Sequence, residues 1–279
     1  MKLTVLCDNN TIIDVYLTGE PAISFFIEDS GKNILFDTGY SDVFIQNAKI
    51  LGIDILSADY IVLSHNHIDH TGGLSYLKEM YEKAEAEGTL CKRPVLVAHP
   101  EIFREVTAEG FGDIGCPLKR EEIESFADLV LSKKPVRITD NITFMGEISE
   151  TTPFETPVAA GVFKDSAGNF SPDFQPDDSA LLYSDKNGLV IITGCSHKGI
   201  CSIVKQAEKI SGRSDFKDII GGFHLLDADD ERLKKTGEFL AGFGMKCTHP
   251  CHCTDLAAKI KLSGYVAIGE VGCGFVVEY

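Results

Sequence analysis

The feature that most constrains this chain is a run of metal-binding side chains directly after a short apolar strand. Residues 60–63, Tyr-Ile-Val-Leu, have the composition of a buried strand, and Ser-His-Asn-His-Ile-Asp-His-Thr-Gly-Gly follows at 64–73. Four of these residues carry metal-ligand groups within six positions: His65, His67, Asp69 and His70. Because so dense a set of ligand types is unusual in a merely polar loop, the stretch predicts a metal site.

The spacing of the four side chains indicates two ions rather than one. Alternate residues of an extended segment point to the same side, so His65 and His67 can hold one ion. Asp69 and His70 follow where the chain turns, and they can reach a second ion about 3.5–4 Å from the first, with a shared water between the two. Imidazole and carboxylate ligands suit zinc, with iron or manganese as alternatives. We therefore expect two divalent metal ions, with Asp69 acting in catalysis as well as in binding.

Two stretches together resemble the signature of the metallo-β-lactamase superfamily. They are residues 61–73, which contain the ligand run, and the strand and turn Asn-Ile-Leu-Phe-Asp-Thr-Gly at 33–39. The resemblance implies an α/β (α+β) fold, a four-layer αββα sandwich with the metals at one edge between the two sheets. The order of predicted elements agrees, because strands come first and strand–helix alternation follows from residue 189. A single domain spanning residues 1–279 is the simplest interpretation.

The resemblance also implies ligands in the second half of the chain. The superfamily usually places an Asp that bridges both metals after a strand ending in Thr-Gly, and here Cys195 follows such a strand at residues 189–194. His197 lies two residues further on, either as a ligand or as a cap of the next predicted helix. The usual third-motif histidine is absent before the strand that begins at Ala180, so His197 or Asp178 would take its place.

The last ligand is expected near the segment Cys-Thr-His-Pro-Cys-His-Cys at 247–253. His252 matches the superfamily position better than His249, to which we assign no role. The same segment could instead form a separate structural zinc or iron–sulfur site, although no distant second cysteine pair supports that alternative.

One further histidine, His224, follows a predicted strand that ends in Gly-Gly-Phe at 221–223. We expect it to act catalytically by transferring a proton, because the metal ligands are already accounted for without it. A ligand role and a purely packed histidine are the alternatives.

A narrower resemblance involves residues 193–200, 221–225 and 250–254. It is to a branch of the superfamily described as similar to 7,8-dihydropterin-6-methyl-4-(β-D-ribofuranosyl)aminobenzene-5′-phosphate synthase. This resemblance implies a dinuclear metal-dependent hydrolase or transferase acting on a phosphorylated or diphosphate-bearing, pterin-like small molecule. Residues 18–22, Thr-Gly-Glu-Pro-Ala, depart from the Glu-His-Gly-like segment expected there. The alternative function is non-hydrolytic, iron-dependent redox or ligand-sensing chemistry on the same fold.

The charge balance restricts the partners. Twenty-six basic and 42 acidic residues give a net charge of −16, which disfavours binding to nucleic acid. No apolar run approaches the roughly 18–20 residues of a membrane helix, and the first residues lack the pattern of a signal peptide. We therefore expect a cytoplasmic protein with a small anionic substrate and no membrane partner, and a homo-oligomer is not excluded.

Overall fold

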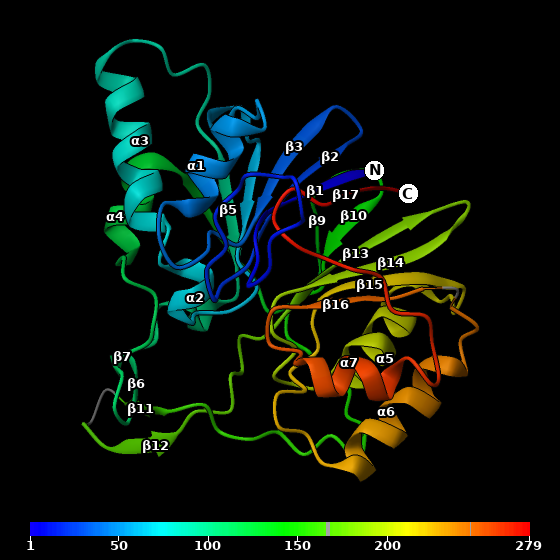
Figure 1. Cartoon of the computed structure of the whole chain (residues 1–279). Coiled ribbons are helices and arrows are strands. Elements are labelled where there is room, and N and C mark those ends of the chain that lie inside the picture. Colours follow the sequence, from blue (N-terminus) through cyan, green and yellow to red (C-terminus); the bar gives the residue numbers. More distant parts are fainter. Residues whose placement is uncertain (166–167, 246) are drawn as a thin grey trace.

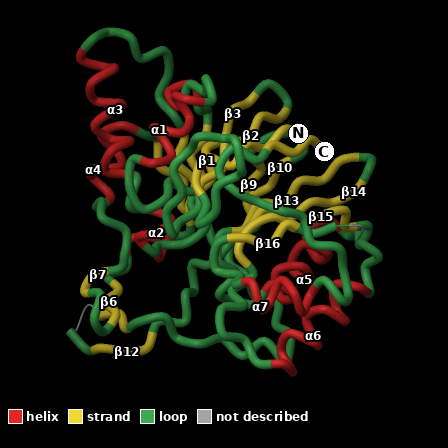
Figure 2. Tube along the Cα trace, in the orientation of Figure 1, coloured by secondary structure: helices red, strands yellow, loops and turns green. Residues whose placement is uncertain are grey.

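Two stacked β-sheets form the centre of the molecule, and helices cover the outer face of each sheet (Figures 1 and 2). This computed structural model describes residues 1–165, 168–245 and 247–279. The arrangement is the four-layer αββα sandwich that the sequence motifs predicted.

The first sheet has seven strands and contains both ends of the chain. In spatial order the strands are β17 (Val276–Glu278), β1 (Lys2–Cys7), β2 (Ser24–Asp29), β3 (Lys32–Phe36), β4 (Tyr60–Val62), β5 (Val95–Ala98) and β8 (Asp128–Leu131). Strand β1 pairs antiparallel with both β2 and β17, and the Met1 amino group donates to the carbonyl of Tyr279 at 3.1 Å. The two termini therefore lie side by side (Figure 1).

The second sheet has six strands, and a smaller sheet extends from the sandwich. The second sheet has the order β16 (His249–Cys251), β15 (Phe216–Gly222), β14 (Gly188–Thr193), β13 (Ala180–Asp185), β10 (Ile142–Phe144) and β9 (Val136–Arg137). The small sheet has the order β12 (Phe170–Pro172), β11 (Val162–Lys164), β6 (Val106–Ala108) and β7 (Gly112–Asp113).

The helices divide between the two outer faces. Helices α1 (Val43–Ile50), α3 (Leu74–Ala86) and α4 (Arg120–Phe126) accompany the first sheet, and α5 (Ile200–Ser211), α6 (Asp230–Ala241) and α7 (Leu256–Leu262) accompany the second (Figure 1). A single turn, α2 (Ile68–Thr71), follows β4 in the ligand run, and two 3₁₀ turns lie at Ile55–Ser57 and Pro100–Phe103. No helix among the described residues is long and apolar enough to cross a membrane.

Three apolar clusters separate the four layers, and neighbouring residues of one strand enter different clusters. Leu35 faces the helices of the first sheet, whereas Phe36 lies between the sheets. In β14, Ile191 packs against α5 and α6, whereas Ile192 lies between the sheets. Successive side chains of a strand point to opposite faces, so a strand buried on both sides must be apolar throughout. The uninterrupted apolar run of β14 therefore reflects its place between two cores.

The parallel strands bring the ends of distant segments to one edge. Strand β3 runs parallel to β4 in the first sheet, and β14, β15 and β16 are mutually parallel in the second. In such sheets, functional side chains collect where the carboxyl ends of the strands meet. The predicted ligands all follow these strand ends.

Local sequence patterns predict strands at 245–248 and 265–268 and a loop at 164–178, and the structure differs in each case; at 265–268 it has only an isolated bridge between Thr248 and Ile268. Residues 245–248 are predicted as a strand, but β16 begins only at His249; of the predicted residues, 246 lies outside the described part of the chain. Met245 instead packs into the apolar core beside the helices, which explains its hydrophobicity without a strand. Residues 164–178, predicted as a loop, contain strand β12, which pairs with β11, while 166–167 lie outside the description.

Candidate metal centre

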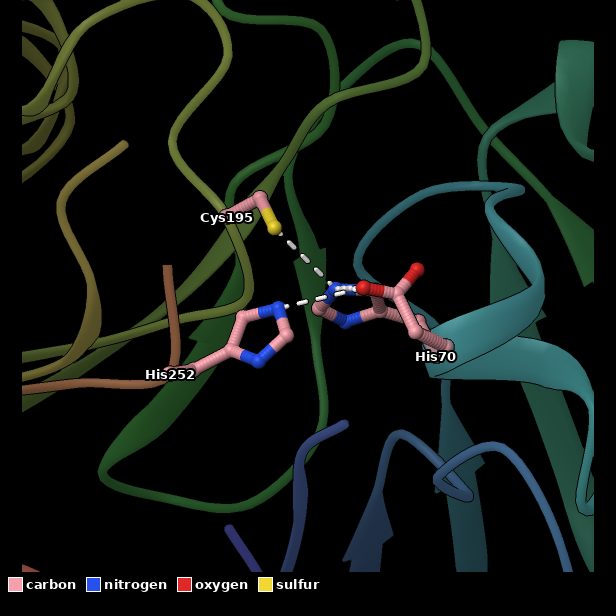
Figure 3. A group of neighbouring side chains, drawn as sticks. His70, Cys195 and His252 are labelled. Carbon is pink, nitrogen blue, oxygen red and sulfur yellow. Dashed lines mark hydrogen bonds and ion pairs between the residues drawn. The ribbon is translucent and has the colours of Figure 1, made fainter. Parts of the chain in front are cut away.

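Six of the eight histidines converge where the carboxyl ends of the parallel strands meet. Together with one aspartate and one cysteine they form three overlapping groups, in each of which the ligand atoms lie within 4.8 Å of one another. Every site residue predicted from the sequence belongs to at least one group, apart from Asp178, the alternative to His197. Figure 3 shows His70, Cys195 and His252 pointing toward one another from three different segments.

The first group consists of His65, His67 and His197. Their rings lie edge to face, with centroids 4.7–4.8 Å apart for each pair. All three side chains are buried, yet Nε2 of His65 and His67 and both ring nitrogens of His197 have no hydrogen-bond partner. Since buried polar atoms are almost always paired, these nitrogens are arranged for something that is not a protein group.

The second group consists of Asp69, His70, Cys195 and His252. Nε2 of His70 lies 3.2 Å from Sγ of Cys195 and 3.7 Å from Oδ2 of Asp69. Nε2 of His252 lies 3.2 Å from the same carboxylate oxygen. One imidazole from each sheet, a thiol and a carboxylate therefore face a common point.

Cys195 links this group to a third one, which it forms with His197 and His224. The rings of His197 and His224 are 4.2 Å apart, and Nδ1 of His224 is buried without a partner. His224 therefore lies within reach of the centre both as a ligand and as a proton carrier. Cys195 is the residue shared by the second and third groups.

Burial and neighbouring charges prepare the ring nitrogens of the first group for a cation. Burial lowers the pKa of His65 and His197 well below the usual value and lowers that of His67 to about 4. These imidazoles are therefore neutral near pH 7, with a free lone pair on each ring. A metal ligand must be in this form.

In the second group, Asp69 and His252 shift each other's pKa in opposite directions. Burial opposes ionisation of Asp69, but the imidazoles of His70 and His252 outweigh it and hold the pKa of this carboxyl well below its usual range. Burial likewise opposes charge on His252, but the hydrogen bond to Asp69 and the neighbouring Cys253 raise the pKa of His252 to about 9. Asp69 is therefore ionised near pH 7, and its carboxylate is in the form that a divalent cation requires.

The donor set fits a pair of divalent ions. Three neutral imidazoles match a zinc-type site, and a carboxylate, two imidazoles and a thiol match a second one. Nitrogen and sulfur donors of this kind favour zinc, iron or related metals over magnesium or calcium.

A buried carboxylate orients two of the imidazoles and was not foreseen as a site residue. Oδ2 of Asp37 accepts hydrogen bonds from Nδ1 of His70 and from the hydroxyl of Ser64, both at 2.7 Å. The Ser64 hydroxyl in turn lies 2.9 Å from Nδ1 of His65. With Nδ1 engaged in each ring, Nε2 is the atom directed to the centre. The Asp-Thr-Gly turn at 37–39 was the available signal for this role.

Gly194 lies against this network and explains why the preceding strand ends in Thr-Gly. A Cβ atom at this position would lie 2.1 Å from Oγ of Ser64 and 3.1 Å from Oδ2 of Asp37. A larger residue would therefore displace the group that orients His65 and His70.

Four residues near the strand ends have left-handed backbone conformations although none is glycine. They are Asp37, Ser196, His224 and His252, with φ between +49° and +62°. Such conformations cost about 1–3 kcal/mol each and gather at functional sites. Here they turn the chain sharply, so that the side chains after β3, β14, β15 and β16 all face the same centre.

Asp178, the alternative to His197, belongs to none of the three groups. Its Oδ2 accepts a hydrogen bond from the backbone amide of Lys198 at 2.8 Å, so it fixes the loop that carries His197. Burial raises the pKa of Asp178 to about 6. Among the described residues, His197 and not Asp178 belongs to the groups of candidate ligands.

The remaining histidines and the cysteine-rich segment have other surroundings. Nδ1 of His249 pairs with Asp218 at 2.6 Å, and Nε2 of His99 lies 3.2 Å from Glu147. Of the residues 247–253, all of which are described, only His252 enters a group of candidate ligands. The segment therefore contributes one candidate ligand to the centre, and its described residues form no group of candidate ligands among themselves.

Glu155 is another residue whose role the sequence did not indicate. It stabilises the start of helix α5, which begins shortly after His197. Its buried carboxylate accepts hydrogen bonds from the backbone amides of Cys201 and Ser202 at 2.9 and 2.8 Å, and from the Ser202 hydroxyl at 2.9 Å. Gly199, with φ of +94°, has no side chain that would collide with it. The carboxylate thus satisfies amides that the helix itself leaves unpaired.

We expect Glu155→Ala to lower the free energy of unfolding of the metal-free protein by about 2–3 kcal/mol, since buried amides lose a charged acceptor. Urea unfolding followed by circular dichroism measures the change. Glu150→Ala is the control, because Glu150 forms a partly exposed ion pair with Lys209 and should cost at most about 1 kcal/mol. Equal losses of unfolding free energy in Glu155→Ala and Glu150→Ala would contradict the stabilising role of Glu155.

Comparisons with known proteins agree with the geometry. The profile of the metallo-beta-lactamase superfamily matches residues 17–115. The 7,8-dihydropterin-6-methyl-4-(beta-D-ribofuranosyl)-aminobenzene-5'-phosphate synthase of Methanocaldococcus jannaschii is 39% identical over 93% of this chain and 89% of that protein. An uncharacterized protein of the same organism is 31% identical over 94% of this chain and 93% of that protein. A solved structure of a metal-dependent hydrolase of the beta-lactamase superfamily is 27% identical, with a TM-score of 0.80 over 100% of this chain and 99% of that one.

Proposed function

Because the chain belongs to the metallo-β-lactamase superfamily, we propose that it is an enzyme that uses two divalent metal ions to act on a small phosphorylated or diphosphate-bearing substrate. One observation carries this proposal. Buried ring nitrogens without partners form one three-histidine group, and a second group with a carboxylate and a thiol adjoins it. Binding of two cations would explain why these nitrogens have no hydrogen-bond partners and why the two ligand groups adjoin each other.

The side chains divide the work between binding and proton transfer. His65, His67 and His197 would hold one ion; Asp69, His70 and His252 would hold the other, with Cys195 between them. Bound there, two such ions supply positive charge that stabilises anionic groups of a substrate. His224 is the neighbouring imidazole left over, and we assign it the transfer of a proton to or from the substrate.

The reaction class rests on the relatives and on the chemistry of the centre. The relative that is 39% identical is named as a synthase of a dihydropterin aminobenzene phosphate compound. We propose a pterin-like substrate with a diphosphate group, from which diphosphate leaves in a transfer reaction. The surface carries a net charge of −16, so a concentrated positive centre is what would attract such an anion.

The test combines metal content with a substrate screen on one preparation. Protein purified without oxygen should hold about two metal ions per chain, and His67→Ala should hold about one. A dihydropterin diphosphate with an aminobenzene ribose phosphate acceptor should release diphosphate faster than esters, lactones or phosphodiesters are hydrolysed. Fewer than two ions in the wild type would overturn the dinuclear centre, and exclusive ester or phosphodiester hydrolysis would overturn the transferase assignment alone.

A second candidate function is supported by the sulfur atoms. The thiol of Cys253 donates to the carbonyl of Cys195 at 3.3 Å, so two cysteines adjoin the centre. Iron-dependent redox or ligand-sensing chemistry would use such a site without releasing diphosphate. Iron as the metal of the anaerobic protein, together with no turnover in the screen, would favour this candidate.

A further inference from the structure

We propose that Asn9 is a positioning residue that holds the imidazole of His252 with its Nε2 atom directed to the second ligand group. Asn9 lies in the loop after β1, 243 positions from His252 in the sequence, and the sequence motifs give it no role. The inference rests on the proposed two-metal function, because it concerns which ring atom meets the second ion.

A single amide contacts His252 at two points. Oδ1 of Asn9 lies 3.1 Å from Nδ1 of His252, and Nδ2 of Asn9 donates to the backbone carbonyl of His252 at 3.2 Å. The Asn9 amide therefore hydrogen-bonds both the ring and the main chain of His252. Because an amide oxygen can only accept, Nδ1 must carry the hydrogen, and Nε2 is the atom offered to a metal.

The neighbouring residue holds the backbone in the same place. Oδ1 of the fully buried Asp8 accepts a hydrogen bond from the backbone amide of His252 at 3.0 Å. This matters because His252 has φ of +50°, a conformation that must be stabilised by its surroundings. Asp8 and Asn9 thus secure, respectively, the left-handed turn and the ring orientation.

The two imidazoles of the second group are oriented by different chemistry. His70 has the carboxylate of Asp37 on Nδ1, whereas His252 has the neutral amide of Asn9. Partners on the distal nitrogen fix ring orientation, and their loss typically lowers metal affinity about 10–100-fold. The ring of His252 lies on the same side as Cys195 and points toward His70 (Figure 3), and it belongs to the second group and not to the first, so its orientation should decide binding of the second ion rather than the first.

The test is a titration of metal-free protein with zinc in competition with a chromophoric chelator. Asn9→Ala should weaken the second zinc ion about 10–100-fold and leave the first within about twofold. Asn9→Asp keeps an acceptor on Nδ1 and should restore the second ion to within about tenfold of the wild type. Asn10→Ala is the matched control, because Asn10 lies in the same loop and contacts Asp8 but is not bonded to His252. Thermal unfolding of each metal-free variant verifies that it is folded; Asn9 is exposed, so its truncation leaves the core intact.

The outcomes separate this inference from the proposed function. Wild-type affinity for both ions in Asn9→Ala would overturn the inference, as would equal weakening in Asn9→Ala and Asn9→Asp, since the acceptor would then be irrelevant. Equal weakening of both ions would overturn it too, because the effect would not be confined to His252. A wild-type protein that binds fewer than two zinc ions would instead contradict the two-metal function itself.

Discussion

Replacing Cys195 with alanine is expected to remove about one metal ion per chain and to lower turnover by roughly a hundredfold or more. Cys195 is the residue shared by two ligand groups, and Nε2 of His70 lies 3.2 Å from its sulfur. Even partners outside the ligand set change metal affinity about 10–100-fold, so losing a shared donor should cost at least as much. Metal analysis and rate, measured on the same preparation, give both quantities.

Two further variants at this position test the reason for the loss. Cys195→Asp supplies the carboxylate that the superfamily usually has there, so it should retain metal, whereas Cys195→Ser should retain less. Cys201→Ala is the control: its thiol is buried within α5 and belongs to no ligand group. If Cys195→Ala kept full metal content and activity, Cys195 would have only a packing role.

Replacing His224 with alanine is expected to leave about two metal ions in place but to reduce turnover by roughly a hundredfold or more, as for a lost general acid or base. His224 has a buried Nδ1 atom without a partner, and its ring lies 4.2 Å from that of His197. The two metal sites have ligands without it. Rate and metal content must again come from one preparation, because rate alone does not separate a ligand from a proton carrier.

The control for this variant is His99→Ala. His99 is a buried histidine whose Nε2 pairs with Glu147, outside every ligand group, so its loss should change stability more than rate. A loss of one metal ion in His224→Ala would make His224 a ligand, and an unchanged rate would leave it only a packing role.

Much of the fold was predictable because its signals are local. The sequence pattern predicts a helix at 74–87, where the structure has α3 (Leu74–Ala86), and another at 229–241, where the structure has α6 (Asp230–Ala241). In the second case the side chain of Asp229 accepts from a backbone amide of the first turn, which is a cap visible in the sequence. Periodicity and capping act over a few residues, so a single sequence contains them.

The candidate site likewise contains residues that a local motif indicates and residues that only the fold brings near. The ligand run from His65 to His70 is compact and follows a strand, so the sequence alone indicates it. The partners that orient the imidazoles come from elsewhere: Asp37 lies 33 residues before His70, and Asn9 lies 243 residues before His252. The Asp-Thr-Gly turn marks Asp37 but not the imidazole that it contacts, and no local motif marks Asn9, since only the folded arrangement brings the strand ends together.

The pairing of β1 with β17 limits when the first sheet can form during synthesis of the chain. Strand β1 is synthesised well before β17, which is one of its two neighbours in the sheet. Until β17 has been synthesised, one edge of β1 is open, and an open edge is a template for pairing with another nascent chain. The loop after β1 must also wait for His252 before it meets its partner. Folding that depends on such distant contacts is slow, so the candidate metal centre can be completed only after the segment that contains His252 has been synthesised.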